Sequence, residues 1–241
     1  MSLGPVGDAR RTRDAYFGVN SGLDSPGVDE PGVDDLGIGR FDVGLAGRRC
    51  RLDRAGAPAK ALRVRRWRAA AGRSDGWLLD SCRGPTVDLG CGPGRLVTAL
   101  IERGVPALGV DSSALAVRLC ARRGAVALRR NLFDVLPGEG RWHHALLADG
   151  NLGIGGDPVA LLSRVHRLLS PRGSLLVELA GEPGLWRGPA RVLRPGGTAT
   201  DWFPWATVGL DAIAEVASAA GLRMCRVREG RRAFAELQRG R

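Results

Sequence analysis

The sequence contains almost no lysine and only one tyrosine. Lys60 is its single lysine, so arginine supplies all the other members of the 36 basic residues. Against 25 acidic residues they leave a formal charge of +11. Arginine in such excess, beside 36 glycines, is typical of a GC-rich coding bias. Because net charge favours non-specific attraction and says little about function, it does not by itself indicate a nucleic-acid partner.

Paired cysteines and long apolar runs are also lacking. The five cysteines are odd in number and widely spaced, which favours free thiols in a reducing compartment. No spacing of histidine, cysteine and carboxylate residues resembles a zinc site, so we expect no metal. No apolar run approaches the roughly 18 residues of a membrane span, and no apolar signal segment is present. We therefore expect a cytoplasmic protein without a membrane partner.

Residues 1–58 are predicted to form an irregular N-terminal arm or a lid. The first 48 residues are poor in core-forming side chains and rich in glycine, aspartate and proline, a composition typical of chain that does not fold alone. Residues 49–68 carry eight basic groups against Asp53 alone, and the pattern over 59–68 suits a basic helix. This block suits either an acidic partner or an exposed helix face.

Beyond this arm, short apolar segments alternate with amphipathic segments that end at glycine. Alternation of this kind, with short loops, predicts a mostly parallel sheet with helices on both faces. A last pair of segments, 222–228 and 232–237, predicts a closing antiparallel hairpin. The fold class is therefore α/β, with a Rossmann-like sheet of seven strands. The five parallel strands are expected at 86–89, 105–110, 125–128, 142–148 and 174–179, and the intervening helices at 95–103, 113–123 and 158–169.

The strongest local signal is the stretch 86–96, which reads TVDLGCGPGRL. It predicts a strand that ends in a glycine-rich turn and opens into a helix. Glycines without a Cβ let a ligand lie against the backbone, and the helix start offers free N–H groups. A P-loop requires a Gly-Lys-Ser/Thr ending, which is absent here. A dinucleotide loop requires G-x-G-x-x-G, and Arg95 stands where its third glycine belongs.

The remaining pattern, Asp88-x-Gly90-x-Gly92-x-Gly94, resembles the first motif of the class I S-adenosylmethionine-dependent methyltransferases, Asp/Glu-x-Gly-x-Gly-x-Gly. The resemblance covers about residues 84–180 well and the closing strands more loosely. It implies a methyltransferase domain over 59–241 that uses S-adenosyl-L-methionine as its cofactor. This cofactor has no pyrophosphate, but carries an ammonium that Asp88 can take, directly or through water, in a charge-assisted hydrogen bond.

The resemblance also implies roles for residues that follow the next strands. Asp111, at the end of the second strand, would accept both ribose hydroxyls, and it also suits a helix N-cap. After the third strand, Asn131 is the best match for the residue that meets the adenine amino group, with Leu132 beside the ring and Asp134 as the alternative. The expected cofactor-binding residues are Asp88, Leu89, Gly90, Cys91, Gly92, Gly94, Asp111, Ser112, Asn131, Leu132 and Asp149.

Methyl transfer needs little covalent help, because the sulfonium is already activated and the enzyme mainly aligns the acceptor. Asp149 follows the fourth strand, where the methyl group faces the acceptor in the family. Asp149, His143 and His144 are candidate bases, but both histidines lie at the start of that strand, the wrong end for catalysis. No catalytic residue is therefore assigned.

The densest aromatic patch lies within residues 181–206, which we expect to be a hairpin inserted as a lid. A lid of this kind would bind a flat or apolar acceptor. The alternative is that its aromatic side chains only pack the hairpin onto the sheet. The patch consists of Trp186, Trp202, Phe203 and Trp205.

The leading interpretation is methyl transfer to a small molecule, such as a natural product. The Asn/Asp-Pro-Pro-aromatic run common in methyltransferases of nucleic-acid amines is absent after the fourth strand, so a nucleic-acid acceptor is not favoured. An RNA or protein methyltransferase that uses the 49–68 block stays open, as does a non-catalytic cofactor-binding regulator. An NAD(P) oxidoreductase is the remote alternative. The acceptor atom and the oligomeric state are not predicted.

Overall fold

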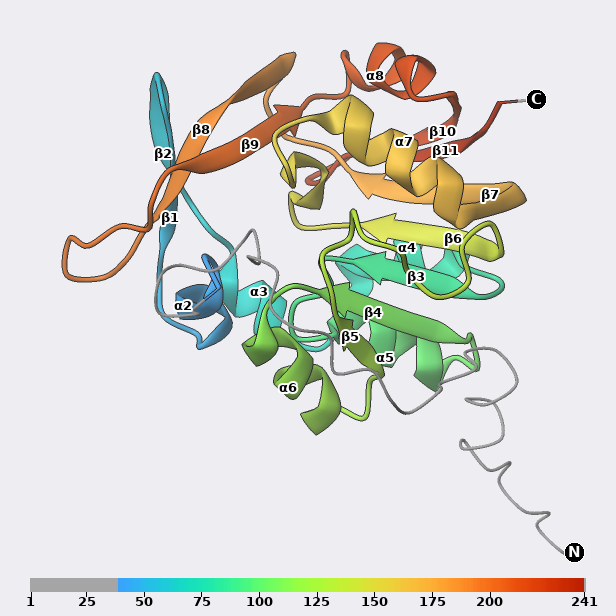
Figure 1. Ribbon diagram of the computed structural model, residues 1–241, viewed down its shortest axis with the longest axis horizontal. Helices are drawn as coiled ribbons and strands as arrows, with labels where there is room; N and C mark the ends of the chain where they lie inside the picture. Colours follow the sequence, from blue (N-terminus) through green and yellow to red (C-terminus); the bar gives the residue numbers. More distant parts are fainter. Residues whose placement is uncertain (1–38, 241) are drawn as a thin grey trace, which may run out of the picture.

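The computed structural model describes residues 39–240, which form two β-sheets (Figure 1). The larger sheet has seven strands in the order β10-β11-β7-β6-β3-β4-β5. The neighbours from β7 to β5 pair in parallel, whereas β10 and β11 pair antiparallel and close one edge. This confirms the predicted fold class. The strands are β3 (Thr86–Leu89), β4 (Ala107–Asp111), β5 (Ala127–Arg129), β6 (Trp142–Leu147), β7 (Leu169–Glu178), β10 (Leu222–Arg228) and β11 (Phe234–Arg239).

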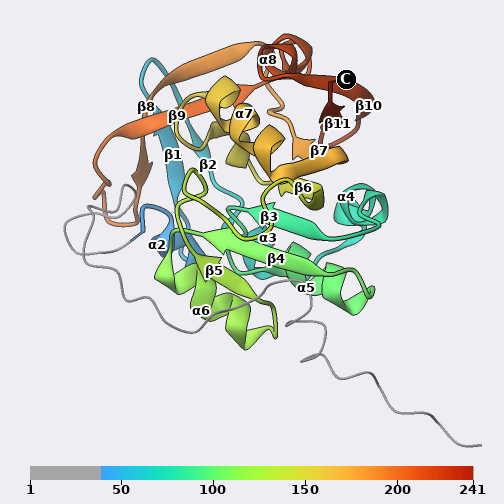
Figure 2. The same ribbon diagram turned by 45° about the vertical axis from the view of Figure 1, so that its right-hand side comes forward.

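Helices cover both faces of this sheet (Figure 2). Side chains alternate along each strand, so Ala145 and Leu147 of β6 face one buried cluster and Leu146 faces the other. The first cluster contains residues of α7 (Pro158–Leu168) and α8 (Ile213–Ala219). The second contains residues of α4 (Gly76–Ser81), α5 (Arg95–Glu102) and α6 (Ala114–Arg122). Burial on both faces explains why the parallel strands are almost continuously apolar.

Local signals place the helix ends well. Asp157 caps α7 by accepting hydrogen bonds from the N–H groups of Val159 and Ala160. Ser113 caps α6 in the same way, through Ala116. Helix α4 differs, because a 3₁₀ turn, η1 (Arg73–Asp75), precedes it, and no side chain caps its first turn. Within residues 39–240 no helix is both long and apolar enough to cross a membrane.

A second, four-stranded sheet, here called the cap sheet, joins the N-terminal part of the described chain to the segment after β7 (Figure 1). Its strands pair antiparallel in the order β2-β1-β8-β9. Its inner side packs around a third buried cluster that includes Leu52, Val192 and Phe203. The strands are β1 (Arg51–Arg54), β2 (Ala57–Ala61), β8 (Leu185–Leu193) and β9 (Phe203–Val208).

The cap sheet corrects two predictions. Residues 1–38 of the expected irregular arm lie outside the described residues, but residues 39–58 contain α2 (Asp42–Leu45) and strand residues of β1 and β2. The basic helix expected over 59–68 is confirmed only in its second half, α3 (Val64–Arg68), because residues up to Ala61 belong to β2. Both errors have one cause, since β1 is stabilised by pairing with the distant strand β8. The domain boundary and the role of 181–206 as a lid stay predictions.

Candidate functional site

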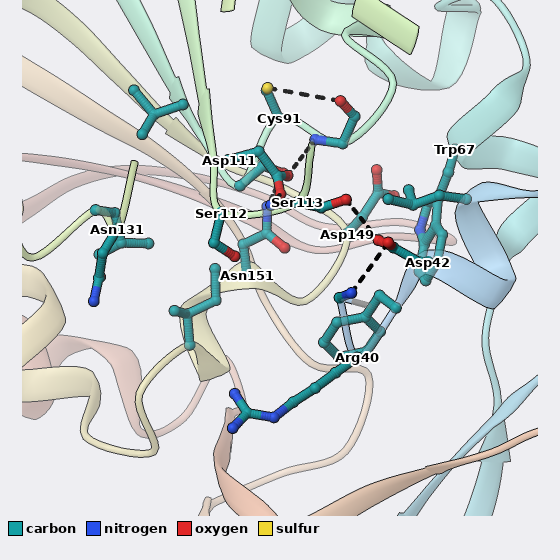
Figure 3. Close-up of a pocket in the computed structure, with 18 of the residues that line it drawn as sticks. Arg40, Asp42, Trp67, Cys91, Asp111, Ser112, Ser113, Asn131, Asp149 and Asn151 are labelled. Carbon is teal, nitrogen blue, oxygen red and sulfur yellow. Dashed lines mark hydrogen bonds between the residues drawn. The ribbon is translucent and has the colours of Figure 1, made fainter. Parts of the chain in front are cut away.

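A cavity of about 440 Å³ lies where the loops after β3, β4, β5 and β6 meet the cap sheet. The backbone of the glycine loop, residues 90–93, forms part of its wall. Figure 3 shows Asn131 at one side of this cavity and Trp67 at the other, with Asp111 and Ser112 between them. We call this space the first cavity.

The glycine loop is held by the segment that follows β6. Gly90 and Gly92 have φ angles of 74° and 52°, which a residue with a Cβ rarely adopts. The side-chain Nδ2 of Asn151 donates hydrogen bonds to the carbonyls of Leu89, at 2.9 Å, and Gly90, at 2.7 Å. A Cβ at Gly90 would lie 2.6 Å from that nitrogen. Asn151 therefore fixes the loop, a role that sequence reasoning did not assign.

Asp111 lies at the end of β4, as predicted, and its carboxylate lines the first cavity. One oxygen accepts the N–H of Gly92 and the other accepts the N–H of Ser113, each at 2.9 Å. Burial raises the pKa of Asp111, and these two hydrogen bonds oppose that shift. A carboxylate has about four acceptor positions, so both oxygens can still accept a hydrogen bond from a bound diol.

Most of the predicted cofactor-binding residues line the first cavity, but three do not. Leu89 and Gly94 are buried behind its wall, where Gly94 lies against Cys120. Asp88 is only 3% exposed, and burial raises its pKa to about 7. Direct contact of Asp88 with a ligand is therefore not supported by the geometry. The predicted residues that line the cavity are Gly90, Cys91, Gly92, Asp111, Ser112, Asn131, Leu132 and Asp149.

Asn131 lines the cavity, while the alternative, Asp134, is exposed and does not. The side-chain Oδ1 of Asn131 accepts the N–H of Phe133 at 3.1 Å. This bond orients the side chain and leaves its Nδ2 and a second lone pair of Oδ1 for another partner.

Asp149 is held in a left-handed conformation with a φ of 56°. Its Oδ2 lies 2.6 Å from Arg95 Nη2, and its Oδ1 lies 3.2 Å from Arg66 Nε. Its N–H donates to Glu178 Oε2 at 2.7 Å. Both oxygens of its carboxylate are therefore engaged by guanidinium groups.

These contacts belong to a network of three arginines and three carboxylates beneath the first cavity. Arg95 is 4% exposed and bridges Asp149 to Asp75, which lies 2.6 Å from its Nη1. Arg232 pairs with Asp75, at 2.9 Å, and with Glu178. Burial, then the charge of Asp149, raises the pKa of Glu178 to about 7. The network, which also includes Arg66, draws on six separate segments, so no local motif in the sequence indicates it.

The predicted bases His143 and His144 lie at the start of β6 and line neither this cavity nor the one described below. His144 is half-buried, with its Nδ1 3.0 Å from Ser174 Oγ. Catalytic use of either histidine therefore has no geometric support.

Aromatic side chains from the cap sheet, from α3 and from the residue before α2 line the first cavity. Of the predicted patch, Phe203 and Trp205 line it, whereas Trp186 and Trp202 do not. Trp202 is 47% exposed and stacks against the Arg191 guanidinium, 4.5 Å from the ring centroid. Phe41, which sequence reasoning missed, packs 5.5 Å from Trp205 and 5.8 Å from Phe203 between ring centroids.

Helix α2 also closes the cavity over Asp111. Asp42 Oδ1 accepts a hydrogen bond from Ser113 Oγ at 2.5 Å, and its Oδ2 accepts the N–H of Gly39 (Figure 3). Arg40 lies over the ring of Phe203, 5.0 Å from its centroid. These residues fall in the segment predicted to be irregular, so the sequence did not indicate them.

A second cavity, of about 820 Å³, adjoins the first. Its walls come from the loops after β6 and β7, the cap sheet and the turn between β10 and β11. The residues that line both cavities are Leu62, Trp67, Asp149 and Trp205. These four side chains therefore mark the junction between the two spaces.

No protein-family model matches the chain, and no curated protein matches it in sequence. Solved structures do match its fold. A SAM-dependent methyltransferase from Bacteroides fragilis, in complex with S-adenosyl-L-homocysteine, superposes with a TM-score of 0.71 at 20% identity, over 84% of this chain and 96% of that one. The 1,6-didemethyltoxoflavin-N1-methyltransferase of Burkholderia thailandensis gives 0.53 at 18% identity, over 70% and 78%.

The amino pentose methyltransferase CalS10 from Micromonospora echinaspora, involved in calicheamicin biosynthesis, gives a TM-score of 0.53 at 15% identity, over 73% of this chain and 94% of that one. At these identities the likeness shows the fold alone. The chain therefore has the class I S-adenosylmethionine-dependent methyltransferase fold, as its glycine motif predicts.

Proposed function

We propose that this protein transfers a methyl group from S-adenosyl-L-methionine to a small-molecule acceptor in the cytoplasm. The observation that carries the proposal is the geometry of the first cavity. Its wall combines the glycine loop with Asp111, whose two oxygens are aligned by backbone N–H groups, at the carboxyl ends of the strands. Solved proteins of the same fold were crystallised with the cofactor or its demethylated product.

The residues of the first cavity would hold the cofactor along its whole length. Asp111 would accept the ribose hydroxyls, and Asn131 with Leu132 would meet the adenine. Gly90 and Gly92 would let the central part lie on the backbone, and Asp149 lies at the end that would hold the methionine group. When bound, the cofactor supplies an activated methyl group on its sulfonium.

The second cavity is the proposed acceptor site. It adjoins the first at Trp67, Asp149 and Trp205, so an acceptor there would lie next to the bound cofactor. Its volume falls within the roughly 300–1,000 Å³ typical of small-molecule sites. The aromatic side chains at the junction suit an acceptor with a flat or apolar body.

An RNA acceptor is less well supported, because several charges of the 49–68 block serve internal contacts. Arg54 pairs with Glu182 at 2.9 Å, and Lys60 pairs with the same residue at 3.2 Å. Arg66 belongs to the buried network, and Arg51 donates to the carbonyl of Ala59. The ion pairs of Arg54, Lys60 and Arg66 leave less positive charge in this block for phosphate contacts.

Asp111→Asn is expected to weaken binding of S-adenosylhomocysteine about 100-fold, because it removes a charged acceptor of two hydrogen bonds. Calorimetric titration measures the dissociation constant. Asp134→Asn, a change at an exposed residue outside the cavity, is the matched control and should leave it unchanged. Equal affinity of Asp111→Asn and the unaltered protein would contradict the assigned role of Asp111.

Turnover is tested with cofactor labelled in its methyl group and a panel of small-molecule acceptors, with the Asp111→Asn variant as a blank. We expect labelled product and S-adenosylhomocysteine in equal amounts. Tight binding of S-adenosylhomocysteine without transfer to any acceptor class would instead favour a non-catalytic regulator.

A further inference from the structure

The carboxylates in the wall of the second cavity are almost all engaged by other groups of the protein. Asp149 and Glu178 belong to the buried arginine network. Glu182 holds two cations, Arg54 and Lys60. The two oxygens of Asp211 both accept the N–H of Gly184, at 2.8 and 3.0 Å. The charges of Asp149, Glu178 and Glu182 are therefore offset by cations, whereas Asp211 is held only by an uncharged N–H.

The cations in the wall of the second cavity fall into two groups. Lys60 and Arg232 form ion pairs with Glu182 and Glu178, respectively. Arg63 and Arg231 line the cavity and are exposed, and their side chains form no ion pair or hydrogen bond with any residue between 39 and 240. Glu229 is the single lining carboxylate without such a partner in that part of the chain. Counted together with the ion-pair partners of its other charged groups, this wall has seven cations and six carboxylates, which leaves one net positive charge around the cavity.

The two arginines reach the cavity from different elements. Arg63 directly precedes α3, and Arg231 lies in the turn between β10 and β11. A guanidinium group binds a carboxylate with two parallel N–H bonds, which gives geometric selectivity as well as attraction. The wall also contains the apolar side chains of Leu62, Trp67 and Trp205.

We infer that the acceptor is a carboxylic acid whose carboxylate is bound by Arg63 and Arg231 at the rim of the second cavity, with its apolar body against Trp67 and Trp205. This inference rests on the proposed function and narrows its substrate class. One net positive charge around the cavity matches one carboxylate.

The test uses the full chain saturated with S-adenosylhomocysteine and three probes of one shape: 2-naphthoate, its primary amide, and 2-naphthylmethylamine. Calorimetry should detect binding of the acid and much weaker binding of the amide and amine. Arg63→Gln and Arg231→Gln should each weaken binding of the acid about tenfold. Glu229→Gln should strengthen it several-fold, an effect that loss of structure would not produce.

Arg172→Gln is the matched control, because Arg172 is exposed and lines neither cavity. It should leave binding of the acid unchanged, and all four variants should keep the affinity for S-adenosylhomocysteine. The inference is overturned if the amine or amide binds as tightly as the acid, if no probe binds, or if both rim variants bind the acid normally. Failure of the proposed function is a separate result, namely no binding of S-adenosylhomocysteine in the first place.

Discussion

Arg95→Met is expected to lower the free energy of unfolding by about 3–5 kcal/mol. Arg95 is 4% exposed and lies 2.6 Å from both Asp75 and Asp149. Removing its guanidinium group leaves the carboxylates of Asp75 and Asp149 with less compensating charge. Removal of one partner of a buried ion pair costs far more than replacement of the whole pair by apolar side chains, because the remaining charge stays buried without its partner. Urea unfolding near neutral pH measures the change.

Arg103→Gln is the matched control for this prediction. Arg103 pairs with Asp80 at 2.8 Å, but the two side chains are 43% and 71% exposed. Solvent screens such pairs, so the control should cost less than about 1 kcal/mol. A loss for Arg95→Met no larger than that of the control would show that the network under the first cavity is not a source of stability.

Asp88→Asn is expected to stabilise the protein above neutral pH and to lose that advantage in acid. Burial raises the pKa of Asp88 to about 7, so the folded state keeps this proton up to about pH 7, whereas the unfolded state releases it near pH 4. The folded state therefore binds more protons between these values, and the contribution of Asp88 to stability falls as the pH rises through this window.

The full shift in the pKa of Asp88, about three units, corresponds to a loss of on the order of 4 kcal/mol in the free energy of unfolding above pH 7. The asparagine variant, which has no such proton to release, would not show this loss. Urea unfolding of both proteins at several pH values between about 4 and 8 measures the difference. Asp134→Asn, at an exposed position, should show no such pH dependence. A difference between Asp88→Asn and the unaltered protein that is constant with pH would contradict the assigned protonation of Asp88.

The parallel sheet could be predicted because its signals are local. Apolar strand residues, the cap at Asp157 and the glycine turn after Leu89 each lie within a few residues of the element that they define. The cap sheet could not be predicted in this way. Leu52 of β1 pairs with Val192 of β8, and neither short segment shows by itself which partner it has.

The residues of the candidate site fall into the same two groups, those with a local signal in the sequence and those without one. Asp111 and Asn131 follow strands, and the carboxyl ends of parallel strands meet at one edge, so their convergence follows from the order of elements. Asn151, which fixes the glycine loop, and Arg95, which fixes Asp149, act through partners more than 50 residues away in the chain. Such contacts depend on tertiary packing and leave no periodic pattern in the sequence.

Titration of the unaltered protein with S-adenosylhomocysteine, beside a parallel titration with NAD, tests the assignment of the first cavity most directly. We expect one molecule of S-adenosylhomocysteine to bind per chain, with no heat from NAD. Binding of NAD, or no binding of S-adenosylhomocysteine by folded protein, would contradict a methyltransferase site built on the glycine loop and Asp111.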